Sequence, residues 1–329
     1  MTLNPTELAL IDRWQRNFPL VERPFTIVGQ SLGLNETATI EIFQRLREAG
    51  VVSRIGAVVR PHTVGASTLA AMRVPAERLD AVAAIVTGQP AVNHNYQRAH
   101  AFNLWFVIAG PDSEAVAATI RRIEEESELR VLNLPLLRSY HIDLGFSLAE
   151  NHSTARSDAR PAGGYWSDPF DRSLLGAIEA GLPIVARPYR DVAEVLGVDE
   201  EEVRSRLRQL AISGIINRFG CVVRHRALGY IANAMAVWDM ADDLVDDIGH
   251  RFARNPNVTL CYRRPRVLPD WPYNLFCMVH AKTKRDAFAV IDDLNLIADA
   301  EVGKQAVLFS TRCFKQRGAT FSNQTGGLH

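Results

Sequence analysis

The sequence is poor in cysteine, with only four in 329 residues and no CxxC pair. All four lie in the second half of the chain, at Cys221, Cys261, Cys277 and Cys313. This number and spacing match neither a disulfide framework nor a zinc site, and free thiols are typical of a reducing compartment. We therefore expect a cytoplasmic protein that holds no metal of its own.

Long apolar runs and excess charge are also missing. No apolar run reaches the roughly 18 residues of a membrane span, and residues 1–14 carry acids rather than the apolar segment of a signal peptide. Lys plus Arg equals Asp plus Glu, at 37 each, which removes the bulk electrostatic case for binding nucleic acid or an anionic membrane. No P-loop, GxGxxG, HExxH or GxSxG motif lies in a suitable context.

An internal repeat is the most informative feature that the sequence does contain. Residues 19–65 recur as residues 183–229, with identity at 16 of the 47 positions. Prolines and glycines recur at matching places, as do the pairs Arg54/Arg218 and Arg60/Arg224. The chain is therefore two copies of one unit joined head to tail.

Each copy reads as an α+β unit: a winged helix-turn-helix, followed by a ferredoxin-like βαββαβ domain. The last ferredoxin-like strand is expected at 131–146 in the first copy and at 302–315 in the second. We expect a winged helix-turn-helix at 1–66, a ferredoxin-like domain at 67–148, a linker at 149–169, a second winged helix-turn-helix at 170–230, a second ferredoxin-like domain at 231–316, and a tail at 317–329. A linker of about 20 residues is long enough for the two copies to pair with each other.

The second recognition helix argues against DNA reading. Its first turn carries Asp199, Glu200, Glu201 and Glu202, which would meet the phosphates with like charge. The acids also have a purely structural explanation, because they favour the positive end of the helix dipole. A structural or pairing role for this module is therefore expected over DNA binding.

The β-hairpins of the two ferredoxin-like domains hold the richest polar chemistry. Tyr96 aligns with Tyr262 and Arg98 with Arg264, and alternation places His94 on the same strand face as Tyr96 and Arg98. Three histidines of the first copy have no counterpart in the second, because His94 aligns with Leu260, His100 with Trp271 and His141 with Arg312. Imidazole suits proton transfer or metal ligation, and guanidinium suits carboxylates.

These residues predict a site for a polyanionic substrate that undergoes proton transfer. We expect His94, His100 and Tyr96 to be catalytic, with His94 as the first choice of proton donor. A core position, a solvated strand face or plain wing structure would also explain several of them. The expected substrate-binding residues are Arg54, Arg60, Arg98, His141, Arg218, Arg224, Tyr262, Arg263, Arg264, Trp271 and Tyr273.

Five motifs carry a resemblance to a known family. They read HNYQRAHAFNLWF at 94–106, LPLLRSYHIDLGF at 134–146, CYRRP at 261–265, WPYNLFCMVH at 271–280 and LFSTRCFK at 308–315. The unit resembles the Lrp/AsnC architecture, and the motifs resemble the two subunits of siroheme decarboxylases of the heme d1 pathway, here fused in one chain.

The resemblance implies loss of carbon dioxide from the C12 and C18 acetates of siroheme, giving 12,18-didecarboxysiroheme. It implies no cofactor beyond the substrate's iron, to which His94, His100 or His141 is a candidate axial ligand. Expected partners are siroheme, the other half of the chain, and further copies or other heme d1 pathway proteins. The alternatives are an Lrp/AsnC-type ligand-sensing transcription regulator, or a heme-binding chaperone or sensor without turnover.

Overall fold

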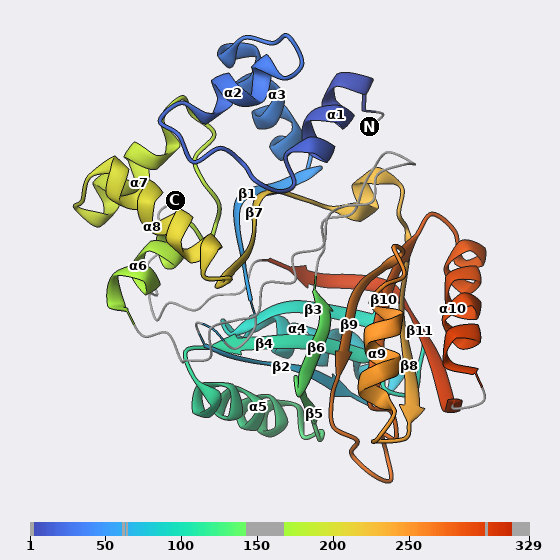
Figure 1. Cartoon of the computed structure of the whole chain (residues 1–329). Helices are drawn as coiled ribbons and strands as arrows, with labels where there is room; N and C mark the ends of the chain where they lie inside the picture. Colours follow the sequence, from blue (N-terminus) through green and yellow to red (C-terminus); the bar gives the residue numbers. More distant parts are fainter. Residues whose placement is uncertain (1–2, 61–62, 64, 143–167, 300–301, 318–329) are drawn as a thin grey trace. The chain divides into compact units, whose positions relative to one another are not determined.

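The computed structural model describes residues 3–60, 63, 65–142, 168–299 and 302–317, which form two compact units (Figure 1). Unit 1 holds the helix-turn-helix segments of both copies, and unit 2 holds both ferredoxin-like segments. The expected domains are thus grouped by type and not by copy. Of the expected linker and tail, residues 149–167 and 318–329 lie outside the described residues.

Unit 1 repeats three helices and one wing strand. The first copy has α1 (Pro5–Arg13), α2 (Pro24–Gln30), α3 (Glu36–Glu48) and β1 (Val52–Val59); the second has α6 (Pro169–Ala177), α7 (Pro188–Leu196), α8 (Glu200–Ile212), β7 (Ile216–Val223) and the short 3₁₀ helix η2 (His225–Leu228). Pro24 and Pro188 open α2 and α7, where a missing N–H costs nothing. Asn35 caps α3 by accepting from the Ala38 N–H at 2.8 Å.

The two wings of unit 1 pair with each other. β1 runs antiparallel to β7, and Gly56 lies directly opposite Gly220. A Cβ at Gly220 would lie 2.4 Å from the Gln15 carbonyl oxygen, whereas a Cβ at Gly56 would meet its nearest atom at 3.5 Å. Gly220 therefore permits a close approach of the Gln15 backbone, whereas no backbone lies as close to Gly56. The helices and both wings share one hydrophobic core.

Unit 2 repeats the ferredoxin-like order around a nine-stranded sheet. The first copy has β2 (Ala66–Met72), η1 (Ala76–Arg78), α4 (Leu79–Gly88), β3 (Val92–Arg98), β4 (Leu104–Gly110), α5 (Ser113–Ser127), β5 (Leu132–Pro135) and β6 (Arg138–Ile142). The second has β8 (Ala232–Met240), α9 (Val245–Phe252), β9 (Val258–Arg263), β10 (Leu275–Ala281), α10 (Lys284–Ala298) and β11 (Val302–Gln316). The strand order is β5-β2-β4-β3-β11-β8-β10-β9-β6.

The last strand of each copy passes from its own half to the other half. β11 pairs with β8 and then with β3 of the first copy. In the first copy this strand is split, so that β5 pairs with β2 and β6 pairs with β9 of the second copy. The prediction that the two halves pair is confirmed. The expectation of one strand over 131–146 is wrong, because β5 ends at Pro135 and β6 begins at Arg138.

These registers also correct one predicted alignment. Arg138 lies opposite Arg263, and Arg312 lies opposite Gln97 at the equivalent place. Arg138 and Arg312 make matching ion pairs, each at 2.5 Å, with Asp246 and Asp80. Arg312 is therefore the counterpart of Arg138 and not of His141, whose counterpart is Lys315.

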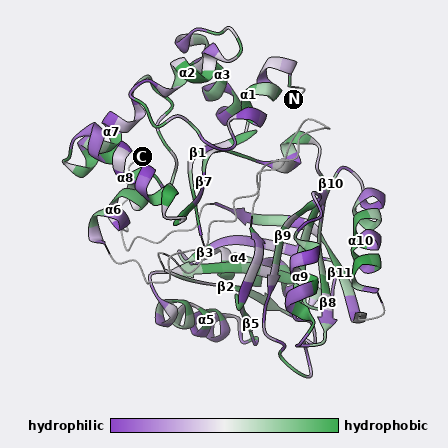
Figure 2. Cartoon of the chain, viewed as in Figure 1, coloured by the Kyte–Doolittle hydropathy of each residue, from purple (hydrophilic) through white to green (hydrophobic). Residues whose placement is uncertain are grey.

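The halves of unit 2 pack through one apolar cluster. Trp105 and Leu134 of the first copy and Phe276, Met278 and Leu308 of the second belong to it. The opposite sheet face is covered by α4 and α5 in the first copy and by α9 and α10 in the second. Figure 2 shows β4 as hydrophobic and the adjacent β3 as hydrophilic. The sheet thus contains a polar strand, β3, next to an apolar strand, β4.

Among the residues that the structure describes, no helix is long and apolar enough to cross a membrane.

Candidate functional site

The two Tyr-x-Arg motifs meet inside unit 2. Arg98, at the end of β3, donates from Nη1 to the Leu308 carbonyl at 2.9 Å. Arg264, just after β9, donates from Nη1 to the Leu134 carbonyl. Each arginine therefore binds the last strand of the other copy. Each guanidinium also lies over the tyrosine of its own motif, at 6.0 Å for Tyr96 and 4.9 Å for Tyr262.

Neither buried guanidinium has a carboxylate partner among the described residues. Arg98 is 7% exposed and Arg264 is 9% exposed, and the Nε of each has no hydrogen-bond partner there. Burial lowers the pKa of each to about 10, so both remain charged at neutral pH. Burial also raises the pKa of Tyr262 to about 12, against the opposing charges of Arg264 and Arg98. Two nearly uncompensated cations at one place are costly for the fold alone and favour an anionic ligand.

The predicted shared face of β3 is confirmed. The rings of His94 and Tyr96 stack with centroids 6.2 Å apart, and Tyr96 in turn lies beneath Arg98. Asn95, between them, faces the other way and donates to the Ala83 carbonyl of α4 at 3.2 Å. The side chains of His94, Tyr96 and Arg98 thus share the face of β3 that is turned away from α4, as alternation on a strand requires.

His100 lies in the turn between β3 and β4. Its Nδ1 accepts a hydrogen bond from the Phe102 N–H at 3.0 Å, and its ring stacks on Phe102. Burial and the charge of Arg73 lower the pKa of His100, so the neutral ring with the proton on Nε2 is favoured. A neutral imidazole is a weak proton donor, and this environment suits His100 better to positioning than to general acid catalysis.

Trp271, one of the expected substrate-binding residues, is fully buried. Its ring is surrounded by those of His100, Phe102, Trp105, Tyr273 and Phe276. A ligand cannot stack on Trp271 without displacing one of these rings. Tyr273 is half-buried at the edge of the cluster, and burial together with the charge of Asp239 raises its pKa. Tyr273 is therefore the better placed of the two to meet a ligand.

Two other predicted residues do not join the arginine pair. Arg263 faces away from Tyr262 and Arg264, and makes ion pairs with Asp242 at 3.0 Å and Asp246 at 3.6 Å. His141 is half-buried on β6, opposite Cys261 on β9. A substrate-binding role stays a prediction for both, and at Arg263 it would require breaking existing ion pairs.

The four wing arginines belong to unit 1. Arg218 is buried and donates to the Gln15 carbonyl at 3.2 Å, and Arg60 donates from Nε to the Gly214 carbonyl at 3.0 Å. Arg54 donates to the Ala57 carbonyl at 3.3 Å, and burial lowers its pKa. Arg224 is exposed, and its backbone N–H donates to the Val51 carbonyl at 2.9 Å. These contacts support the wing-structure interpretation, and substrate contact stays a prediction.

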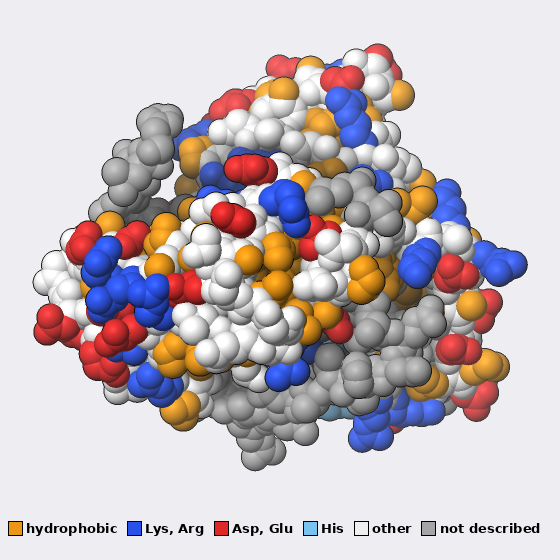
Figure 3. All heavy atoms as spheres, turned by 90° about the horizontal axis from the view of Figure 1, so that it is seen from above, with side chains coloured by type: hydrophobic (Ala, Val, Ile, Leu, Met, Phe, Trp, Pro, Cys, Tyr) orange, Lys and Arg blue, Asp and Glu red, His pale blue; other side chains and the backbone are white. Residues whose placement is uncertain are grey.

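The acids of the recognition helices are engaged within unit 1. Glu200 pairs with Arg187, Glu201 pairs with Arg204 at 2.6 Å, and Glu36 of the first copy pairs with Arg23. Basic and acidic side chains lie side by side on the face drawn in Figure 3. The arginines nearest the helix starts are thus neutralised by neighbouring acids, which disfavours a phosphate-binding surface.

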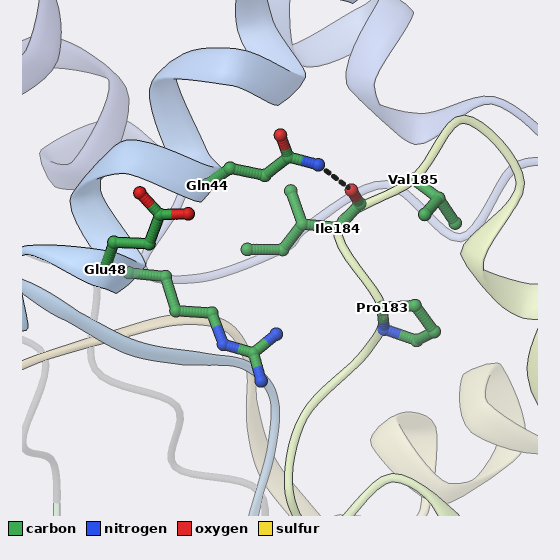
Figure 4. A pocket seen from close by; sticks show the side chains of 6 residues that line it. Gln44, Glu48, Pro183, Ile184 and Val185 are labelled. Carbon is green, nitrogen blue, oxygen red and sulfur yellow. Dashed lines mark hydrogen bonds between the residues drawn. The ribbon is translucent and has the colours of Figure 1, made fainter. Parts of the chain in front are cut away.

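A pocket of unit 1 lies between α3 and the segment that precedes α7 (Figure 4). Gln44 donates there to the Ile184 carbonyl at 3.0 Å, beside Glu48, Pro183 and Val185. It holds none of the predicted site residues and no cluster of groups suited to proton transfer.

A polar network in the second copy was not predicted. His280 on β10 contacts Thr259 Oγ1 through Nδ1 and Asn233 Nδ2 through Nε2, each at 2.9 Å. Asn233 Oδ1 accepts from the Ser310 hydroxyl at 3.4 Å. Alternation in the motif WPYNLFCMVH places His280 on the face of Phe276 and Met278, and this signal could have found it. Within the described part of the chain, no group of three or more His, Cys, Asp or Glu side chains could hold a metal ion.

Comparisons with known proteins match both unit types twice. Residues 7–52 and 171–216 match the family described as "Siroheme decarboxylase NirDL-like HTH domain", and residues 64–141 and 227–315 match the "AsnC-like ligand binding domain". The chain is 45% identical to a "Siroheme decarboxylase NirDL subunit" of Paracoccus denitrificans (strain Pd 1222), over 98% of this chain and 99% of the relative.

Two further matches complete the comparison. A "Siroheme decarboxylase NirL subunit" of Stutzerimonas stutzeri is 48% identical over 152 residues, which are 45% of this chain and 88% of that subunit. The crystal structure of "the siroheme decarboxylase NirDL in co-complex with iron-uroporphyrin III analogue" superposes with a TM-score of 0.67 and 28% identity, covering 96% of this chain and 93% of the other. One copy of the present repeat therefore matches most of a separate subunit elsewhere.

Proposed function

The chain belongs to the siroheme decarboxylase family, and we propose that it removes carbon dioxide from the C12 and C18 acetate side chains of siroheme. The product is 12,18-didecarboxysiroheme, an intermediate of heme d1 biosynthesis, and the enzyme is a carboxy-lyase. A C–C bond breaks in each acetate, carbon dioxide leaves, and the electron pair that remains on the methylene carbon takes up a proton to give a methyl group.

The observation that carries this proposal is the pair of buried arginines without carboxylate partners in the described residues. Siroheme is rimmed by acetates and propionates, and each carboxylate can accept two parallel hydrogen bonds from one guanidinium. The Nη groups of Arg98 and Arg264 bond to protein, whereas the Nε of each is a buried donor without a hydrogen-bond partner among the described residues, and a carboxylate would satisfy it. These two residues hold carboxylates of the substrate rim, with Tyr262 beside them.

The proton comes from the first copy. His94 lies in line with Tyr96 and Arg98 on one strand face, and an imidazolium there donates to the carbanion. General acid catalysis of this kind contributes roughly 10²–10⁴-fold. A role for His100 or His141 as a second proton donor or as an axial ligand of the substrate's iron stays a prediction, and at His100 it would require the ring to give up the hydrogen bond from the Phe102 N–H. The tetrapyrrole itself takes up the developing negative charge, so the reaction uses no cofactor beyond the substrate's iron.

The cellular setting follows from the same proposal. All four cysteines are free thiols, which supports a cytoplasmic location. Assembly into further oligomers and contact with other heme d1 pathway proteins stay predictions.

Anaerobic incubation of the purified chain with siroheme, followed by mass spectrometry of the tetrapyrrole, tests the proposed function. Stepwise loss of two carboxyl groups supports it, and the position of the new methyl groups by NMR tests the C12 and C18 assignment. Tight siroheme binding with no mass change would refute decarboxylase activity and favour a sensor or chaperone.

A further inference from the structure

Helix α10 carries an apolar row on its solvent side. Phe288 and Leu296 are 46% and 80% exposed, and the ring of Phe288 is held by an edge contact with Phe309 at 5.3 Å. Residues four apart lie in one row along a helix, so Phe288, Asp292 and Leu296 share this row. The other side of α10 is buried in the core that it shares with β8 and β10. Two large apolar side chains in one exposed row form a surface against which another element can pack.

The equivalent helix of the first copy shows that the fold does not need this row. α5 and α10 both have 15 residues, and their buried residues occupy the same positions of the helix. At the position of Phe288, α5 has Ala117, and at the position of Leu296 it has Glu125. The two apolar residues therefore have a role other than packing against the sheet.

Charged side chains are distributed along this side of α10 in two groups. Lys284 and Arg285 open the helix, and Asp292 and Asp293 lie about two turns further on. All four are exposed. No residue of opposite charge lies three or four positions away from any of them, which is the spacing at which side chains of one helix pair. Because positive charge in a first turn also opposes the helix dipole, the stability of α10 alone does not explain this pattern.

The charges of α5, in contrast, are matched within their own helix. Glu114 and Arg121 make an ion pair at 2.7 Å. The equivalent positions of α10 carry Arg285 and Asp292, with the two signs exchanged, and Phe288 stands between them where α5 has an alanine. Neither Arg285 nor Asp292 makes an ion pair with a described residue. The charges of α10 are therefore available to a partner.

The pattern is complementary to itself when two α10 helices cross antiparallel. A twofold axis beside Phe288 places Arg285 of one copy next to Asp292 of the other. It also places Lys284 next to Asp293, and each pair occurs twice. The two Phe288 rings meet at the centre of this contact. Rows of residues spaced by four pack into each other at a crossing angle of about 50°, which limits the contact to the turns that carry these charges.

The same geometry disfavours α5 as the partner of α10. If α10 crossed α5 of a second copy in this way, Arg285 would meet Arg121, and Asp292 would meet Glu114. Like charges placed opposite each other suppress a contact. The pattern thus favours α10 against α10.

We propose that the solvent side of α10 is a contact surface between two copies of this chain. The proposal goes beyond the proposed function and does not depend on it, because the contact involves neither substrate nor turnover. One helix pair buries far less than the roughly 1,600 Å² of a standard protein interface, so the dimer is weak. Its ion pairs are exposed to solvent, so rising salt weakens it further.

Sedimentation velocity of the purified full chain tests the inference. At about 50 mM salt and up to about 0.5 mM protein, a monomer–dimer equilibrium is expected, and about 0.5 M salt should raise the dimer Kd about tenfold. Lys284→Asp with Arg285→Asp should abolish the dimer. Asp292→Lys with Asp293→Lys should abolish it as well, since either pair of substitutions leaves charges of one sign on both sides of the contact.

Reversing the charges on both sides should restore the contact. An equimolar mixture of the two double variants should form a heterodimer, and a chain with all four substitutions should again form a homodimer. Phe288→Ala should raise the dimer Kd about tenfold, since it truncates the centre of the contact. Arg121→Asp with Arg122→Asp, which changes the net charge equally but on α5, is the matched control and should leave the dimer Kd unchanged.

The possible outcomes are distinct. A chain that stays monomeric up to about 0.5 mM at low salt would overturn the inference and would mean that the apolar row meets another segment or another protein. A dimer that persists in both double variants would overturn it too, because the contact would then lie elsewhere. Circular dichroism verifies that each variant is folded, and Asp292→Asn gives a milder form of the same test. Decarboxylation by the unaltered chain is measured separately, so failure of the proposed function would be recognised independently.

Discussion

His100 and Trp271 align with each other in the two copies, yet their rings are in contact, with centroids 5.6 Å apart and planes at 80°. The imidazole comes from the turn after β3 and the indole from the longer loop after β9. Two residues that the alignment places at equivalent positions of the two copies are thus in contact with each other in the structure. The two hairpins therefore pack against each other through these rings and are not independent of each other.

His94→Ala should lose most of the decarboxylase activity and keep siroheme binding. A proton donor acts mainly in the transition state, so kcat falls by about 10²–10⁴-fold while the Kd for siroheme changes little. Single-turnover mass spectrometry and absorbance titration measure the two quantities. His250→Ala, at an exposed histidine of α9 in the same unit, is the matched control. Normal turnover in His94→Ala would refute the assignment, and a lost siroheme spectrum with residual turnover would make His94 an iron ligand.

Stability should depend on pH through His100. Its folded-state pKa is lowered, so between that value and the unfolded value of about 6.5 the unfolded chain binds more protons. Stability therefore falls as the pH falls through this window, and His100→Gln should reduce the fall. Urea midpoints at pH 7 and pH 5 for both proteins give the answer. Equal falls in the two proteins would show that His100 does not contribute.

Trp271→Ala should destabilise unit 2 strongly. The ring is fully buried among five others, and truncation of such a side chain costs about 3–5 kcal/mol. Leu268→Ala, in the same loop but 70% exposed, should change stability by less than about 0.5 kcal/mol. Chemical denaturation followed by tryptophan fluorescence compares the two. A small effect of Trp271→Ala would mean that the loop does not hold the aromatic cluster together.

The paired wing glycines should respond differently to the same change. At Gly220 a Cβ would lie 2.4 Å from a backbone oxygen of Gln15, whereas at Gly56 its nearest neighbour would be 3.5 Å away. Gly220→Ala should therefore lower the melting temperature clearly, and Gly56→Ala should leave it nearly unchanged. Calorimetry on both variants checks this. Similar melting temperatures for the two would contradict the close approach at Gly220.

The helix-turn-helix modules should not bind DNA. Acids pair with the arginines nearest the starts of α3 and α8, so no unneutralised basic edge faces a phosphate there. An electrophoretic mobility shift assay with random duplex at low salt should show no complex. A salt-sensitive shift would revive the alternative of a transcription regulator.

Much of the fold was predictable from local signals. Pro24 and Pro188 at helix starts, positive-φ glycines such as Gly33 and Gly197, and alternation along β3 each decide a local conformation. Because the unit is repeated, the helix-start prolines and the glycines occur in both copies of the sequence. The grouping of the copies into one unit of helix-turn-helix modules and one unit of sheets was not predictable, because it depends on contacts between residues more than 150 positions apart.

The site was predictable in its residue types and less so in its partners. Alternation gave the line of His94, Tyr96 and Arg98, but it could not reveal that Arg263 turns toward Asp242. The burial of Trp271 and the true counterpart of His141 could not be predicted, because neither an inserted loop nor a strand that changes partner has a local signature in the sequence. His280 was missed because a lone histidine in an apolar motif resembles a core residue.

The exchange of last strands has a consequence for biosynthesis. Among the described residues, the strand next to β3 on its outer side is β11, which pairs with it through residues 310–316 of the second copy. While the protein is being translated, the first ferredoxin-like half therefore leaves the ribosome with an unsatisfied strand edge, and it keeps that edge until β11 of the second copy has also been made. An open edge is a template for unwanted pairing. The polar residues of β3 thus also suit a strand edge that is exposed to water until β11 pairs with it.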